Sequence, residues 1–368
     1  MTVEAAALEV KILSSVKHAN CLLELFELLG GSSPRESMSA LHALRRVFVA
    51  FLERGDVGVR APQDDAPDAK ASALATYRAW LREQHARFAT ELCGFVRAGS
   101  AAAQVAATRT LLQLVQRGGD TLRATKEAAA EFGVEMFAAL VKALVRCGAP
   151  SNQLLAVVRD EILGADACVD SRFYFLKSVP AALGVKAAAA DAPSSGSGKR
   201  AKKAAVAEGE VDAAGDADFD ATGATANLVV LLALVEMPTD ASVLKRLLVD
   251  SIERSEAPEG PEKVFPNRLG KKRKRKRKPA KVLRIDMHRK AFSAAWSALL
   301  TQPLALGSEA MEAILIALPS KVIPHLDSPA LLRDLLADTV VASRALKVSL
   351  FCTVTFRANP SHNLTRSP

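Results

Sequence analysis

The chain of 368 residues has few aromatic residues, because Phe, Trp and Tyr make up only 5% of a sequence that is 49% hydrophobic. Ala and Leu supply most of that hydrophobic fraction. Both favour helices, whereas β-sandwiches and barrels are richer in aromatic and β-branched residues. Proline and glycine are scarce too, at 17 and 20 residues, which excludes a collagen-like or wholly disordered chain. The composition therefore predicts an all-α protein.

Cysteine is rare, and its spacing fits neither a disulfide framework nor a zinc site. The five thiols are odd in number and never stand in CxxC spacing; they are Cys21, Cys93, Cys147, Cys168 and Cys352. We therefore expect reduced thiols in an intracellular protein, with no metal and no cofactor.

Long apolar runs are missing as well. No stretch of about 18 uncharged apolar residues occurs, which excludes a conventional transmembrane helix. Glu4, Glu9 and Lys11 interrupt the apolar N-terminus, so the hydrophobic core of a signal peptide is not found there. The expected protein is soluble, and a membrane is not among its expected partners.

The sequence also lacks the motifs that mark common enzyme sites. It has no GxSxG nucleophile turn, no HExxH zinc motif and no glycine-rich dinucleotide fingerprint. Gly198 and Lys199 resemble the end of a phosphate-binding loop, but that loop needs Gly and Ser or Thr where Pro193 and Arg200 stand. The six histidines are dispersed. We therefore expect no catalytic residues and no enzyme activity.

Positive charge is concentrated in one short run. Removing its eight charges from the net charge of +9 leaves +1, so the rest of the chain is nearly neutral. The run consists of Lys271, Lys272, Arg273, Lys274, Arg275, Lys276, Arg277 and Lys278. It is either a solvated tail or a nuclear-localisation segment that an import receptor binds and that also contacts pre-rRNA phosphates. We favour nuclear import. Aromatic residues are not interleaved, so sequence-specific reading of RNA is not expected.

Amphipathic helical patterns follow one another along residues 1–184, separated by short connections. We expect helices over 4–29, 34–54, 70–97, 100–117, 121–147 with a break near Gly133, 151–163 and 168–178. Ser33, Pro34 and Gly55 fit the cap, the first turn and the end of the second helix. One apolar stripe per helix favours a HEAT- or armadillo-like α-solenoid of stacked amphipathic helices, with disordered linkers, over a closed bundle.

Changes in composition divide the chain into six parts. We expect a helical-repeat region over 1–184, a disordered charged linker over 185–226, a helical segment broken at Pro238 over 227–254, an exposed linker with the basic run over 255–284, a further helical part over 285–339 and an atypical, disordered tail over 340–368. Within 285–339 the helical patterns cover 285–301 and 308–318.

Seven short segments have the character of family motifs. They are Tyr77–Glu83, Asp170–Lys177, Val235–Pro238, His288–Phe292, Trp296–Leu300, Lys321–Leu326 and Pro329–Asp338. Together they resemble the nucleolar complex protein 4 family, most specifically over 288–338, which is similar to the start of that family's CCAAT-binding-factor-type domain. From about residue 340 the sequence departs from the family. We therefore expect a truncated C-terminal domain, with 340–368 as a disordered tail or a mispredicted gene end.

The resemblance implies a helical-repeat scaffold in the nucleus and nucleolus. It implies a heterodimer with another nucleolar assembly protein within the small-subunit processome, and a role in processing, assembly and export of pre-small ribosomal subunits. The motif residues that it marks for structure or partner docking are Phe292, Trp296, Pro324, His325, Pro329, Leu332 and Asp334.

Two other functions remain open at this point. A large-subunit nucleolar assembly factor shares the C-terminal domain type. A DNA-binding transcription factor is suggested by the domain's name, but it needs a recognition helix rich in Arg, Asn and Gln or a zinc module, and the sequence has neither.

Overall fold

The computed structural model describes residues 2–57, 69–122, 132–184, 221–238, 244, 246–249, 281–301 and 308–326. Its α-helices are α1 (Val3–Ser14), α2 (Cys21–Leu29), α3 (Pro34–Arg54), α4 (Ala69–Ala98), α5 (Ala101–Leu122), α6 (Val134–Val145), α7 (Asn152–Val158), α8 (Val169–Ala182), α9 (Ala221–Ala233), α11 (Ile285–Leu300) and α12 (Ser308–Ala317). Shorter 3-10 or π-helical turns are η1 (Val16–His18), η3 (Arg159–Leu163), η5 (Lys281–Leu283), η7 (Leu318–Val322) and η8 (Ile323–His325). No strand occurs in these ranges, which confirms the all-α prediction.

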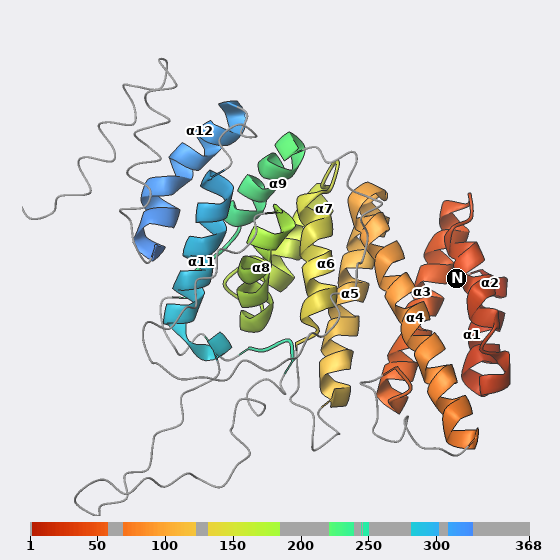
Figure 1. Ribbon diagram of the computed structural model, residues 1–368. Helices are drawn as coiled ribbons and strands as arrows, with labels where there is room; N and C mark the ends of the chain where they lie inside the picture. Colours follow the sequence, from red (N-terminus) through yellow and green to blue (C-terminus); the bar gives the residue numbers. More distant parts are fainter. Residues whose placement is uncertain are drawn as a thin grey trace, which may run out of the picture.

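The helices stack into one elongated array (Figure 1). At one end α1, α2 and α3 pack together, and α3 contacts α5. The array continues through α4, α5 and α6 to α8, which packs against both α6 and α11. α12 lies at the opposite end and contacts α9. Because each helix contacts mainly its neighbours in the array, the architecture is the predicted α-solenoid.

A single apolar core runs through the array, from Ala5 in α1 to Val322 in η7. Phe292 and Trp296 of α11, in the further helical part predicted over 285–339, belong to this same core. The C-terminal helices are therefore packed as a continuation of the N-terminal ones.

The ends of α3 follow directly from its sequence. The side-chain oxygen of Ser33 accepts a hydrogen bond from the backbone N–H of Glu36 at 3.5 Å, and Pro34 occupies the first turn. Gly55 ends the helix in the left-handed conformation, with φ of 77°, which a residue with a Cβ adopts only at a cost. Both predicted ends of this helix are confirmed.

The prediction of one helix over 4–29 is wrong, because the chain breaks into α1, η1 and α2. Ser15 is extended, with φ of −159° and ψ of 140°, and its side chain accepts a hydrogen bond from the backbone N–H of Lys17. A hydroxyl that bonds locally to the backbone competes with the helical ladder in this way. As a result Val16 is 62% exposed rather than part of the buried stripe.

Within the predicted helical segment 227–254, α9 ends at Ala233, five residues before the predicted break at Pro238. Residues 246–249, which we call the strap, are not helical and lie against α5 and α8. Gly118 and Gly119 were expected to interrupt the chain, but both lie inside α5. A Cβ on Gly119 would lie 2.3 Å from Cγ1 of Val249, so this glycine admits the strap rather than ending the helix.

Two predicted linkers end earlier than their composition indicates. α9 begins at Ala221, inside the predicted linker 185–226, and its small residues Ala224 and Thr225 are buried. Small side chains carry little hydrophobic signal, but they allow helices to approach closely. Likewise Val282, in the predicted exposed linker 255–284, is buried in η5. The other residues of these linkers, and 340–368, lie outside the described residues.

Candidate functional site

Charged side chains are buried where α8 begins, in the middle of the array. Asp170 is fully buried, and its carboxylate accepts hydrogen bonds from the backbone N–H groups of Leu248 at 2.9 and 3.0 Å and Val249 at 2.9 Å. It also accepts one from the N–H of Ser171 at 2.9 Å. Burial raises the pKa of Asp170 to about 6, although these N–H donors favour the charged form. Asp170 therefore fixes the strap to α8.

Arg172 is the second buried charge of α8. Its Nη1 donates to the backbone oxygens of Gly164, at 3.1 Å, and Glu236, while the N–H of Glu236 donates to Leu163 at 3.0 Å. Burial lowers the pKa of the Arg172 guanidinium, and the nearby Glu236 charge opposes this. The side chain thus ties the chain after α9 to the end of η3.

His288 of α11 completes this buried polar group. Its Nε2 lies 2.7 Å from the backbone oxygen of Val282, and its ring lies 5.2 Å from the ring of Phe173, centroid to centroid. The pKa of His288 is lowered to about 4, chiefly by burial and also by the positive charge of Arg172. His288 is therefore a neutral packing histidine between α8 and η5 at neutral pH.

The family-motif residues of α11 and η8 form a second cluster beside it. Phe292 and Trp296 are both buried, with ring centroids 6.2 Å apart. The His325 ring meets Phe292 edge to face at 6.2 Å, and burial lowers the pKa of His325. Pro324 is exposed. The structure thus brings these four residues together, with the aromatic pair inside and Pro324 at the surface.

The remaining predicted site residues are not among the described residues. Pro329, Leu332 and Asp334 lie outside the described residues, as does the basic run Lys271–Lys278. Docking and import therefore stay predictions for these positions.

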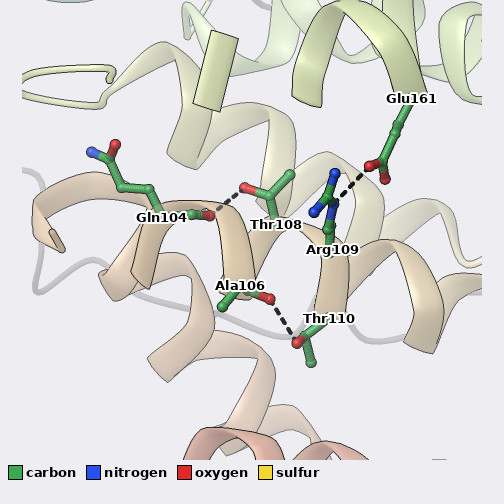
Figure 2. Close-up of polar contacts among 6 residues, drawn as sticks. All are labelled: Gln104, Ala106, Thr108, Arg109, Thr110 and Glu161. Carbon is green, nitrogen blue, oxygen red and sulfur yellow. Dashed lines mark hydrogen bonds and ion pairs between the residues drawn. The ribbon is translucent and has the colours of Figure 1, made fainter. Parts of the chain in front are cut away.

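A polar contact on α5 was not found by reading the sequence. The Gln104 side chain donates from Nε2 to the oxygen of Ala149 at 3.0 Å and accepts from the N–H of Ser151 at 3.1 Å, which holds the connection between α6 and α7. Further along α5, Arg109 pairs with Glu161 of η3 at 2.7 Å (Figure 2). That pair is exposed and adds little stability, whereas the buried Gln104 is a structural clamp. Polar residues inside an otherwise apolar stripe, as at Gln104 and Asp170, are the signal that could have identified such clamps.

The buried histidines make stability depend on pH. Burial lowers the pKa of His85 to about 4, as for His288, from 6.5. Their contribution to stability is complete above pH 6.5 and is lost as pH falls to 4. Asp170, whose pKa is raised to about 6, has the opposite effect: its contribution to stability increases as pH falls from 6 to 3.8. Two such histidines against one carboxyl leave a fall of about 1.4 kcal/mol per pH unit between pH 6 and 4. His42 and His325, whose pKa values burial also lowers, act in the same sense as His85 and His288.

Denaturant unfolding across this pH range measures the effect. We expect His85→Phe to reduce the slope, because the ring packs 5.3 Å from Phe48 and needs no charge there. His18→Gln, at an exposed position, is the control and should leave the slope unchanged. A free energy of unfolding that stays constant from pH 6.5 to 4 would contradict the assignment.

Other chemistry is not assembled in the described part of the chain. No group of three or more His, Cys, Asp or Glu residues there could hold a metal ion. Cys21, Cys93 and Cys147 are free thiols. Within the described ranges, every helix is too short or too polar to cross a bilayer.

Comparison with known families agrees with this architecture. A family model described as nucleolar complex protein 4-like, TPR repeats, matches residues 2–187, which is more than half of the chain. No curated protein matches the chain significantly. The match begins at α1 and ends just after α8, so it covers the whole N-terminal stack including the Asp170 clamp. The chain therefore belongs to the nucleolar complex protein 4-like family of helical-repeat proteins, which places it among the nucleolar factors of ribosome biogenesis.

Proposed function

We propose that the protein is a non-enzymatic scaffold for small ribosomal subunit assembly, acting by binding another nucleolar assembly protein of the small-subunit processome. The observation that carries this proposal is the continuous core from α1 to η7, which makes one stiff array of helices. Such arrays act by presenting a long surface to other macromolecules. The family match supports the nucleolar setting.

The partner binds, in this proposal, at the edge formed by α11 and η8. Phe292 and Trp296 are buried there and support the surface from beneath, while Pro324 is exposed and His325 half-buried. Pro329, Leu332 and Asp334 follow in sequence, and in our proposal they bind the same partner. An exposed proline and a half-buried histidine over a buried aromatic pair suit a surface that binds without rearranging.

Depletion of the protein tests the proposed pathway. We expect precursors of the small-subunit rRNA to accumulate while those of the large-subunit rRNA keep their normal level, measured by hybridisation to total RNA. Accumulation of large-subunit precursors alone would favour the alternative assembly factor of the same domain family. A sequence-specific shift of a CCAAT duplex by the purified chain at physiological salt would favour the transcription factor.

The basic run supplies nuclear import in this proposal. The test is a variant in which Ala replaces Arg273, Lys274, Arg275 and Lys276 and the basic residues of the weaker cluster Lys199–Lys203. We expect a fluorescent fusion of this variant to leave the nucleus, because an import receptor binds consecutive positive charges. Arg273→Lys with Arg275→Lys preserves the charge and is expected to preserve import. Nucleolar concentration of the alanine variant equal to that of wild type would instead indicate import on a partner. The same charges contact pre-rRNA phosphates, so this contact should weaken steeply with salt.

A further inference from the structure

The first helix of the array has an apolar stripe on each of two faces. Ala5, Leu8 and Ile12 are buried against the rest of the array. On the opposite face Val3 and Val10 are 88% and 68% exposed, the largest exposures of large hydrophobic residues in α1. Ala7, also exposed, lies between them. The spacing of four and three residues places these three side chains in one line along the helix.

Nothing in the described part of the chain covers this outer stripe. α1 packs against α2, α3 and η1, and it forms the end of the array (Figure 1). The outer face of a terminal repeat is normally polar, because it meets water. A terminal helix with valines outward at helical spacing is the pattern of a helix that packs against another helix.

A groove lies between α4 and η1, which follows and contacts α1. Val16 stands two residues after the end of α1, and its exposed side chain lines the groove together with Lys17, Asn20, Thr76, Tyr77 and Trp80. The groove has a volume of about 370 Å³. The rings of Tyr77 and Trp80 stack at a centroid distance of 6.5 Å. Aromatic side chains that are only half-buried offer both apolar area and a polar tip to a ligand.

Two lysines supply positive charge at the groove end, where the charges of Asp56 and Arg54 act on Tyr77 in opposite senses. Lys11 flanks the outer stripe and Lys17 lines the groove, and both side chains are exposed. No carboxylate among the described residues lies within ion-pair distance of either amine. Glu4 lies on the same flank, but two turns away towards the start of α1. An occupant should therefore carry Asp or Glu at the groove end of the surface.

The charge of the surface decides between a second copy and a different protein. A dimer of this chain would bring Lys11 and Lys17 close to their own copies, because a twofold interface places the same patch on both sides. A single acidic helix of another protein meets no such repulsion.

We propose that the outer stripe of α1 and the groove on α4 bind one amphipathic helix of another protein, with acidic side chains opposite Lys11 and Lys17. This surface deepens the proposed scaffold function by defining the chemistry of a partner. It lies at the opposite end of the array from the α11–η8 edge, so either surface can fail without the other.

The test places a photo-crosslinking amino acid at Val10 or Val16 of the full chain in cells and identifies the attached peptide by mass spectrometry. Ile316 of α12, which is 71% exposed, is the matched control position. We expect both N-terminal positions to attach to one segment of another protein. That segment should have apolar residues at intervals of three and four and Asp or Glu beside them. A synthetic peptide of it should bind the purified chain.

Charge reversal makes the assignment specific. Lys11→Glu with Lys17→Glu should weaken binding of that peptide about tenfold, and replacing its acidic residues with Lys should restore binding to the variant. Both substituted positions are exposed, so the fold should keep its thermal stability. Crosslinks to this chain's own peptides, to a basic or non-amphipathic segment, or no more crosslinking than at Ile316 would overturn the proposal. A charge reversal without effect would do so as well.

Discussion

Asp170→Asn is expected to lower the local stability of the strap by about 3 kcal/mol. The carboxylate accepts hydrogen bonds from the N–H groups of Ser171, Leu248 and Val249. An amide offers one oxygen and turns an N–H₂ donor towards them, so at least one buried donor loses its acceptor, at about 1–3 kcal/mol each. Hydrogen exchange of the Leu248 and Val249 amides measures the effect. Asp160→Asn, an exposed acid on η3, is the control and should leave this exchange unchanged.

A second pair of variants tests the strap from the side of α5. Gly119→Ala forces a Cβ to within 2.3 Å of Val249, whereas the Cβ of Gly118→Ala meets no atom within 4 Å. Alanine favours helix over glycine by about 1 kcal/mol. Gly118→Ala should therefore stabilise the chain, and Gly119→Ala should displace the strap and speed exchange at Val249. Equal effects of the two substitutions would show that the strap does not pack on α5.

Trp296→Ala is expected to lower the free energy of unfolding by about 3–5 kcal/mol, because the largest side chain of the C-terminal core is then replaced by a cavity. Trp296 is 1% exposed and packs beside Phe292. Its ring N–H is buried without a hydrogen-bond partner, so Trp296→Phe, which removes that donor, should cost less than Trp296→Ala. Denaturant unfolding of the full chain provides the measurement.

Lys290→Ala is the control for this pair, because Lys290 is exposed on the same helix, and it should change stability by no more than about 0.5 kcal/mol. If Trp296→Ala unfolds like wild type, α11 is not part of the common core. The partner-docking role of the α11–η8 edge would then lose its rigid base.

Local sequence signals identified the helices of the array but not all of their ends. The cap at Ser33 and the end at Gly55 were predicted because each depends on a few neighbouring residues. The break at Ser15 was missed, since the apolar spacing continues through Val16 as if the helix did. Gly118 and Gly119 predicted a break that does not occur, because glycine weakens a helix locally. The glycine at position 119 instead makes room for the strap, which is more than a hundred residues away in sequence.

The candidate site was predictable only in part. The aromatic residues of α11 were expected to share a helical face, and Phe292 and Trp296 are indeed buried side by side. The clamps at Asp170, Arg172 and Gln104 were not expected, because charged and amide side chains on a helix ordinarily face water. Their acceptors and donors are backbone groups from distant segments, which no local pattern reveals.

The sequence by itself determined the helical composition, the repeating apolar stripes and hence the solenoid, because these depend on residue type and spacing within one or two turns. It also indicated the family, through short sequence motifs spread along the chain from α4 onward. Only the tertiary structure decided that α11 continues the N-terminal core and that the first residues of α8 are buried, so that Asp170 and Arg172 hold distant backbone. The same packing left the valines of α1 without a neighbour. An apolar stripe shows that a helix has something to bury, and the arrangement of the other helices determines which stripes are covered and which remain for a partner.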